Sequence, residues 1–341
     1  MNTLEAMTKH RTPNNEHLKS VPDLSIIIVC YKGWPRLHKC LKSIDKFAGN
    51  NFTTEVIIVD NKSDDEAIHD IEKQYPKFKF ISNTMNGGFA NGSNLGSRNA
   101  SGDFLLFLNP DTVVSEPEIE KLLNAAKTPP DYTISSCRQV NENGKESVAS
   151  GDFPSMFNLT GFQRAVFRSR VRHTVKQPAD IISPDWISGS VLMIKREVFL
   201  QIHGFDEDFW MYFEDVDLCR RISDINGKIA LYSSIVIEHN HGGSSRINIK
   251  TTTLTKTEVF ISRHLYISKH KTGMERFIIQ MFLIVNNLIS AGIMALVGLL
   301  LFFIPKLYSR TLIFLRLLAY YAGALLRQSW ISPRSPNFIK R

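Results

Sequence analysis

The chain has 341 residues, of which 43% are hydrophobic and 22% are charged, and its formal net charge is +8 at pH 7. This composition excludes a disordered or collagen-like chain, and the length suits one large domain or two medium ones. Residues 263–341 contain eleven Lys or Arg and a single acidic residue, Glu275. Because the longest apolar run lies in the same segment, the charge favours an anionic membrane surface as a partner. It argues against nucleic acid, for which the sequence has no recognition motif.

The chain begins with a polar segment, residues 1–22, that lacks the apolar core of a signal peptide. We predict a flexible tail on a protein that is not exported. The cysteines form no CxxC pair and are expected to be unpaired thiols in a reducing compartment, which argues against a disulfide framework or a zinc site. They are Cys30, Cys40, Cys137 and Cys219.

Short apolar runs alternate with helical patterns in the first part of the chain, which predicts a Rossmann-like, mostly parallel sheet flanked by helices. The runs are rich in β-branched or aromatic residues, as in strands buried on both faces. Ligands bind beyond the carboxyl ends of such strands, and Asp60 and Asp111 lie at two of these ends. Strands are expected at 25–30, 55–60, 78–81 and 104–108, and helices at 35–44, 64–74 and from the glycine-rich turn at 86–94 onward.

Beyond residue 130 the pattern weakens. A helical pattern at 215–222 follows the aromatic segment 209–213, and Glu214, Asp215 and Asp217 crowd its start. Neighbouring carboxylates repel one another and resist ionising together. A helix N-terminus attracts one or two acids, but that preference does not explain the aromatic wall beside them. Strands are expected at 186–194, 228–232 and 235–239, the last two at the edge of the sheet.

The C-terminal part holds 28 uncharged residues, 277–304, which is longer than the roughly 20 needed to span a bilayer. A second apolar stretch covers 307–326. A single span would place the seven basic residues from Lys306 onward on the far side, against the positive-inside tendency. We expect a re-entrant hairpin or an interfacial helix pair instead, and a buried core helix is the alternative. The first stretch is interrupted by Gln280, Asn286, Asn287 and Ser290.

Seven short motifs, taken in order and spacing, resemble the family 2 glycosyltransferases, which have the GT-A fold and invert the anomeric centre. The resemblance is closest to the rhamnosyltransferase-like branch of bacterial surface polysaccharide synthesis. It implies a catalytic domain at 23–255, between the tail and a membrane-associating helical region at 256–341. The motifs are SIIIVCY at 25–31, VDNKS at 59–63, NGGFA at 86–90, LNPD at 108–111, GFDE at 204–207, FEDVDL at 213–218 and HNHGGS at 239–244.

The resemblance implies a nucleotide-sugar site along the sheet edge. Asp60 would accept a hydrogen bond from the pyrimidine N–H, because a carboxylate is a pure acceptor. The alternative is that Asp60 or Ser63 caps the next helix. The residues expected to contact the donor are Tyr31, Asp60, Asn61, Gly88, Phe89, Asn94, Asn109 and Asp111.

The segment 109–111 stands where the family has a DxD motif, whose carboxylates hold a divalent cation, Mg²⁺ or Mn²⁺, against the diphosphate. Here Asn109 replaces the first carboxylate, so Asp111 is the expected carboxylate ligand. A plain turn is the alternative for this segment. The resemblance implies His239 as a second ligand, with His241 as its competitor, and a glycine-rich lid at 242–245.

Asp215 occupies the position of the family's general base, which would take the proton from the acceptor hydroxyl group as it attacks the sugar. Glu214 and Asp217 would orient the acceptor or a neighbouring arginine, with Arg221 as one candidate. Trp186 and Gly189 would line the sugar and acceptor pocket, although a core position for Trp186 is equally compatible with the sequence.

The resemblance therefore implies an inverting transfer of a sugar, L-rhamnose from its dTDP donor, to a lipid-linked saccharide at the cytoplasmic face of a bacterial membrane. A sugar nucleotidyltransferase is one alternative, but it would have a basic, glycine-rich loop after the first strand, and residues 31–35 (YKGWP) match this poorly. A degenerate, membrane-bound scaffold that only binds nucleotide sugars is the other, and Asn109 is the feature that favours it.

Overall fold

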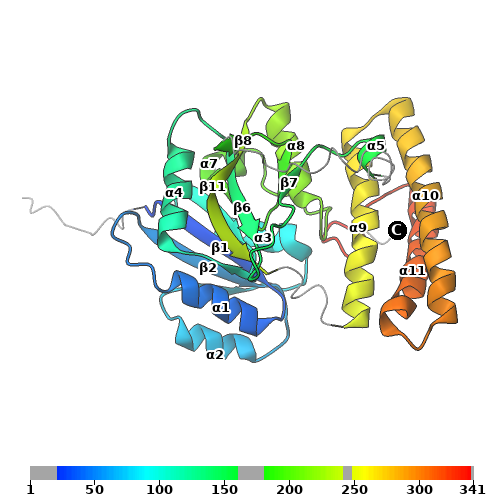
Figure 1. The fold of residues 1–341 in the computed structure, drawn as a ribbon, viewed down its shortest axis with the longest axis horizontal. Helices are drawn as coiled ribbons and strands as arrows, with labels where there is room; N and C mark the ends of the chain where they lie inside the picture. Colours follow the sequence, from blue (N-terminus) through cyan, green and yellow to red (C-terminus); the bar gives the residue numbers. More distant parts are fainter. Residues whose placement is uncertain (1–20, 160–179, 241–247, 339–341) are drawn as a thin grey trace, which may run out of the picture.

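The structure, a computed structural model, describes residues 21–159, 180–240 and 248–338. It has an α/β part and, beside it, a group of three long helices formed by the C-terminal quarter (Figure 1). Residues 1–20 of the expected tail lie outside the described residues, as do His241 and the expected lid at 242–245.

The α/β part is built on a mixed nine-stranded sheet flanked by helices, as the sequence predicts; four of its eight strand pairs are parallel, and these hold most of the paired residues. β1, β2, β3 and β4 are parallel, β10 runs antiparallel to both β4 and β6, and β11 is parallel to β6. The order is β3 (Lys79–Ser82), β2 (Thr54–Asp60), β1 (Leu24–Cys30), β4 (Phe104–Leu108), β10 (Val191–Lys195), β6 (Ile134–Val140), β11 (Ile229–His239) and β5 (Thr112–Val113), with β8 (Ile181–Ile182) also paired to β11.

Helices cover both faces of the sheet because alternate residues of each strand point to opposite sides. Ile26 and Ile28 of β1 join the core cluster of α1 and α4, whereas Ile27 joins that of α3 and α8. All four cysteines are buried and unpaired, as expected. The helices are α1 (Trp34–Ile44), α2 (Ala67–Gln74), α3 (Gly88–Arg98), α4 (Glu116–Lys127), α5 (Met156–Leu159), α7 (Arg196–Gln201) and α8 (Glu214–Asp224).

Three expectations for the later strands and boundaries need correction. The two edge strands at 228–232 and 235–239 are one strand, β11, because a bulge between Tyr232 and Val236 absorbs the break in the apolar pattern. This strand lies inside the sheet, between β6 and β5. The strand expected at 186–194 is two: β9 (Trp186–Ile187), which pairs with β7 (Ser150–Gly151) in a separate sheet, and β10. The expected domain boundary at 255/256 lies within helix α9 (Ile249–His270), and the division into domains stays a prediction.

The C-terminal quarter forms α9 (Ile249–His270), α10 (Gly273–Leu300) and α11 (Pro305–Arg327), with α10 and α11 packed as an antiparallel hairpin (Figure 1). By length and composition alone, α10 and α11 could each cross a membrane. Most of the apolar window of each is left uncovered, with only 22% and 33% of it buried.

Two of the four polar residues that interrupt the first apolar stretch, Gln280 and Asn287, are buried. Gln280 and Asn287 are seven residues apart, so they lie on one face of α10. The amide oxygen of Gln280 lies against Nδ1 of His264 on α9, and Asn287 Nδ2 donates to Tyr321 Oη at 3.0 Å. Tyr321 Oη is in turn 2.9 Å from His264 Nε2. These buried contacts join all three helices.

The segment after α11 returns to the α/β part. The Arg334 guanidinium lies 4.4 Å from the centre of the Trp210 ring, Ser335 Oγ donates to the carbonyl oxygen of Glu207 at 2.9 Å, and Asn337 Nδ2 donates to Asp208 at 2.9 Å. Just before α10 begins, Lys269 of α9 pairs with Asp208 as well. The chain segments that precede and follow the hairpin are therefore both fastened to the same region of the α/β part.

The buried histidine of α9 should make the fold sensitive to acid. Burial, which outweighs the hydrogen bond with Gln280, lowers the pKa of His264 to about 4, below the usual value near 6.5. When folding lowers the pKa of a histidine, the folded state loses stability as the pH falls through the pKa of that histidine in the unfolded chain. The reason is that the unfolded chain then binds the proton more tightly than the folded chain does. Between pH 7 and about pH 4.5 we expect a loss of about 2.5 kcal/mol from this group.

Urea unfolding in mild detergent at the two pH values measures this loss. A His264→Gln variant keeps an amide in place of the ring but cannot be protonated, so it should lack this component of the pH dependence. An identical pH dependence in both proteins would contradict the assignment to His264.

Candidate active site

The first part of the site lies where β2 ends. Asp60 is buried, and its carboxylate accepts hydrogen bonds from the N–H and hydroxyl groups of Ser63, at 3.2 and 2.5 Å. Ser63 Oγ also accepts the N–H of Lys32 at 2.9 Å, which ties the loops after β1 and β2 together. The capping alternative is wrong, because α2 begins after Glu66, and the side chain that accepts an N–H of its first turn is that of Asp65, which accepts the N–H of Ala67 at 3.1 Å. Contact of Asp60 with the donor base stays a prediction.

The glycine-rich loop is held from two sides. Gly88 has φ of 83°, and a Cβ atom there would lie 1.6 Å from the carbonyl oxygen of Trp210. The N–H of Phe89 donates to that same oxygen at 3.2 Å. From the other side, Asn61 Nδ2 donates to Gly88 O at 2.9 Å and to Asn86 at 3.2 Å. Only glycine fits this close approach, so the loop has one position between β2 and the segment before α8.

Asn94, expected to contact the donor, holds the turn that follows α7. Its Nδ2 donates to Phe205 O at 2.8 Å and to Glu207 Oε1 at 2.9 Å, and its Oδ1 accepts the N–H of Phe205 at 2.9 Å. The side chain is buried and both ends of its amide are occupied. The structure therefore gives Asn94 a positioning role, in which it fixes the segment that leads toward Asp215.

A second cluster forms because β11 pairs with β5. The register places His239 opposite Thr112, next to the loop that follows β4. His239 Nε2 lies 3.1 Å from Asp111 Oδ1 and 3.3 Å from Asn109 Nδ2, and His239 Nδ1 lies 2.7 Å from Gln139 Oε1. Arg36 of α1 approaches the other oxygen of Asp111 at 3.7 Å. Side chains more than a hundred residues apart thus meet at one sheet edge.

The donor set of this cluster fits a divalent cation. Two cis ligands of an octahedral ion with bonds of about 2.1 Å are about 3.0 Å apart, close to the 3.1 Å between His239 Nε2 and Asp111 Oδ1. Carboxylate oxygen and imidazole nitrogen both bind Mn²⁺, and the carboxylate also suits Mg²⁺. Among the described residues, Asp, Glu, His and Cys form no group of three that could hold a metal. Substrate and water oxygens would therefore fill the remaining coordination positions of the cation.

Asp215 lies in the first turn of α8, beside two other residues named from the sequence. Its Oδ2 accepts the N–H of Gly189 at 2.9 Å. A Cβ atom on Gly189 would be 3.1 Å from the Phe89 ring and 3.5 Å from Asp215 Cβ. Burial, which outweighs the backbone hydrogen bonds, raises the pKa of Asp215 above the usual value. The side chain is still partly exposed. Asp215 is therefore a fixed, reachable carboxylate with raised basicity.

The turn into α8 is strained. Tyr212 and Phe213 have φ of 69° and 70°, in the left-handed region that side chains disfavour. Such strain persists only where surrounding contacts hold it, and it concentrates at functional sites. Here it directs the chain from the Trp210 contact into the helix that carries Asp215.

The two flanking carboxylates have different environments. Glu214 is buried, and its Oε2 has no hydrogen-bond partner among the described residues; burial first, and then the charge of Asp215, raise its pKa well above the usual value. Burial also acts to raise the pKa of Asp217, but hydrogen bonds from His270 and Arg221 outweigh it and hold the pKa below the usual value. Burial therefore favours the neutral form of Glu214, whereas the partners of Asp217 favour its ionised form.

Asp217 was expected to orient either the acceptor or a neighbouring arginine, and in the structure it orients Arg221. The Asp217 carboxylate accepts a hydrogen bond from Arg221 Nε at 2.8 Å and lies 2.7 Å from His270 Nε2 of α9. Arg221 also donates to the carbonyl oxygens of Ile202 and Gly204. These contacts hold α8 in place from two sides and use the polar atoms that were expected to meet the acceptor.

Two further residues named from the sequence, Trp186 and Tyr31, are aromatic. The Trp186 ring packs against two hydrophobic clusters, and its Nε1 donates to Asp152 O at 2.9 Å, which agrees with a core position and leaves a pocket role a prediction. Tyr31 is partly exposed after β1.

Sequence reasoning missed Arg36, Gln139 and His270. Arg36 lies in the first turn after β1, at the ligand-binding edge, so the topology rule could have found it. A glutamine inside a strand and a histidine at a helix end carry no such signal.

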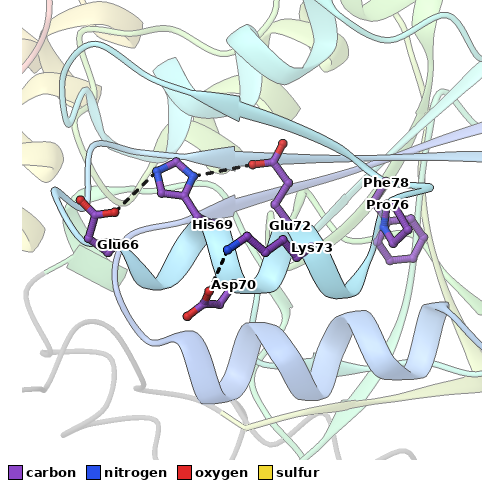
Figure 2. A pocket seen from close by; sticks show the side chains of 7 residues that line it. All are labelled: Glu66, His69, Asp70, Glu72, Lys73, Pro76 and Phe78. Carbon is purple, nitrogen blue, oxygen red and sulfur yellow. Dashed lines mark ion pairs between the residues drawn. The ribbon is translucent and has the colours of Figure 1, made fainter.

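A surface hollow of about 650 Å³ lies on α2, apart from these clusters (Figure 2). Its ion pairs join residues three apart on one exposed helix, such as Lys73 and Asp70 at 3.5 Å. Pairs of this kind contribute little, and the hollow has no buried polar group to define a ligand. We assign it no role.

Comparisons with known proteins agree with this geometry. The model of glycosyl transferase family 2 matches residues 25–217. The chain is 27% identical to the N-acetylglucosaminyl-diphospho-decaprenol L-rhamnosyltransferase of Mycobacterium tuberculosis, with 65% of this chain and 78% of that protein covered. It is 24% identical to rhamnosyltransferase WbbL of Escherichia coli, with 58% and 76% covered.

Two solved structures share the fold. The crystal structure of GalNAc-T7 with UDP, GalNAc and Mn²⁺ has a TM-score of 0.51 at 16% identity and covers 74% of this chain and 51% of its own. Mannosyltransferase PcManGT from Pyrobaculum calidifontis, in complex with GDP-Man and Mn²⁺, has a TM-score of 0.50 at 15% identity, with 91% and 80% covered.

At these identities the two structures support the fold alone, and they confirm the expected GT-A architecture. The family match extends over more than half of the chain, and it includes the ends of β2 and β4 and the start of α8. This chain belongs to glycosyl transferase family 2 and is a glycosyltransferase.

Proposed function

We propose that this glycosyltransferase inverts the anomeric centre as it moves L-rhamnose from dTDP-rhamnose to a lipid-linked saccharide at the cytoplasmic face of a bacterial membrane. The observation that carries the proposal is the position of Asp215, held by the N–H of Gly189 beside Phe89 and raised in pKa. Two relatives named as rhamnosyltransferases support the choice of sugar.

In this mechanism Asp215 accepts the proton of the acceptor hydroxyl group as its oxygen attacks the sugar. A base with a pKa nearer to neutrality than that of an ordinary aspartate accepts a proton more effectively at the operating pH. The N–H groups of Gly189 and Val216 orient the two carboxylate oxygens, at 2.9 and 2.8 Å, and each oxygen keeps a second lone pair for the acceptor hydroxyl group. The raised pKa of Glu214 beside it disfavours a second negative charge at the site.

Asp111 and His239 would hold a divalent cation, Mg²⁺ or Mn²⁺, at the other end of the reacting bond. Bound there, the cation supplies positive charge that stabilises the departing nucleoside diphosphate. Arg36, 3.7 Å from Asp111 Oδ2 and about half exposed, adds a further positive charge at this edge.

The α10–α11 hairpin supports a lipid-linked acceptor. Its outward residues are large and apolar, with Ile289 and Ile293 each 59% exposed and Leu296 65% exposed. An apolar surface of this kind is typical of contact with a membrane or with another protein. The basic excess of the C-terminal quarter favours an anionic membrane. One relative is named for a diphospho-decaprenol acceptor, which is a lipid-linked saccharide.

The general base can be tested by substitution. Asp215→Asn should lower kcat by roughly 10²- to 10⁴-fold, because the amide cannot accept the proton, and should leave donor binding within about twofold. Single-turnover transfer and calorimetric donor binding measure the two effects. Asp224→Asn, on the same helix and in an exposed pair with Arg220, is the matched control and should keep full activity. Normal turnover by Asp215→Asn would overturn this assignment.

The donor can be identified by thermal shift with nucleotide sugars, with and without Mn²⁺. A ligand at about a hundred times its Kd stabilises the folded state by about 2.7 kcal/mol, so dTDP-rhamnose with Mn²⁺ should raise Tm by several degrees. Asp111→Asn should remove the part of the shift that depends on Mn²⁺. A larger shift with another nucleotide sugar would refute the choice of donor.

Membrane attachment can be tested by flotation with vesicles that contain phosphatidylglycerol. The double variant Ile289→Asp, Ile293→Asp should weaken binding by roughly a hundredfold, because each side chain contributes about 1.5–3 kcal/mol when buried in an apolar phase. Val148→Asp, Ile225→Asp is the matched control, since both residues are exposed but lie on the α/β part. Unchanged binding of the hairpin variant would contradict attachment through this surface.

A further inference from the structure

Gln139 is a buried polar residue inside the sheet that the proposed transfer does not use. It lies on β6 and is 1% exposed. The register pairs it with Ile237, two residues before His239, so the side chains of Gln139 and His239 are diagonal neighbours on one face. A buried amide without hydrogen bonds is costly. A glutamine at this position therefore needs a specific partner.

The amide oxygen of Gln139 faces two donors. It lies 2.7 Å from His239 Nδ1 and accepts the hydroxyl group of Ser190 at 2.8 Å. Its Nε2 has no hydrogen-bond partner among the described residues. The oxygen is thus the end of the amide that is in use, and it faces the imidazole ring.

This contact decides which nitrogen of His239 carries the proton. An acceptor at Nδ1 favours the tautomer that is protonated at Nδ1, which leaves the lone pair on Nε2. In agreement, Asn109 Nδ2, a donor, lies 3.3 Å from Nε2. That lone pair then points toward the Asp111 carboxylate, 3.1 Å away. Two acceptors at this distance repel each other, and a cation bound between them would remove that repulsion.

We infer that Gln139 is a positioning residue for the metal: its amide oxygen holds His239 in the Nδ1-protonated tautomer and thereby presents Nε2, together with Asp111, to a divalent cation. The inference rests on the metal site of the proposed function. Outer residues that orient a ligating histidine in this way commonly change metal affinity by 10- to 100-fold when they are replaced.

The experiment measures Mn²⁺ binding to the purified full-length protein in detergent, with and without dTDP, from the electron paramagnetic resonance signal of free Mn²⁺. Gln139→Leu removes the acceptor and should raise the Kd for Mn²⁺ by 10- to 100-fold. Gln139→Met, which is closer in shape to glutamine, makes the same test if the leucine variant does not fold.

Gln139→Glu is the discriminating variant. It offers only acceptor oxygens to Nδ1, so Mn²⁺ affinity should stay within about threefold of the parent protein or become tighter. If Gln139 acted only through packing, the glutamate variant would weaken binding as the leucine variant does, and this result would overturn the inference. Ser136→Ala is the matched control, because Ser136 is buried on the same strand and bonds to Val191 O. It should bind Mn²⁺ normally.

The remaining outcomes separate this inference from the proposed function. Mn²⁺ binding by the parent protein with equal binding by Gln139→Leu overturns the role of Gln139 and leaves the metal-dependent transfer standing. No Mn²⁺ binding by the parent protein, with or without dTDP, refutes both.

Discussion

The contact between Gly88 and the carbonyl group of Trp210 is the constraint on which the site depends. A Cβ atom at position 88 would lie 1.6 Å from that oxygen, so the glycine-rich loop and the segment before α8 fit only because one of them has no side chain there. The same segment continues through two left-handed residues into α8, where Asp215 lies. Asp60 is the last residue of β2 and Asp111 follows β4, and these two strands pair with β1 on either side. The loop contact sets where the α8 carboxylates stand relative to this edge.

Three carboxylates within four residues differ in pKa because their partners differ. Hydrogen bonds from His270 and Arg221 lower the pKa of Asp217, which holds α8 against α9. Glu214 has a buried oxygen without a partner among the described residues, and burial raises its pKa well above the usual value. Asp215 accepts the backbone N–H groups of Gly189 and Val216, and burial raises its pKa above the usual value. Division of like charges in this way separates roles that adjacent residues could not share if all were ionised.

The helical quarter combines a polar interior with an apolar exterior. Gln280, Asn287, His264 and Tyr321 bond to one another between the helices, while large apolar residues face outward. This arrangement suits helices whose surroundings are apolar, since polar groups then find partners only inside. The contacts of Arg334 and Ser335 with the segment around Trp210 bring the end of the hairpin to the part of the chain that positions α8. The apolar hairpin and the segment that leads to Asp215 thus share one structural support.

The sequence alone determined the order of strands and helices in the first half, the family resemblance, and the residue types at the ends of β2 and β4, because these depend on local periodicity and on motifs a few residues long. It also indicated Asp215 as the expected general base and the two apolar stretches that form the hairpin. It did not determine that 228–239 is one bulged strand, that Asn94 serves the turn at 204–207, or that Gln139 meets His239. Those facts depend on strand register and on contacts between residues more than a hundred positions apart, which leave no periodic trace in the chain. Only the tertiary structure decided which polar side chain faces which partner.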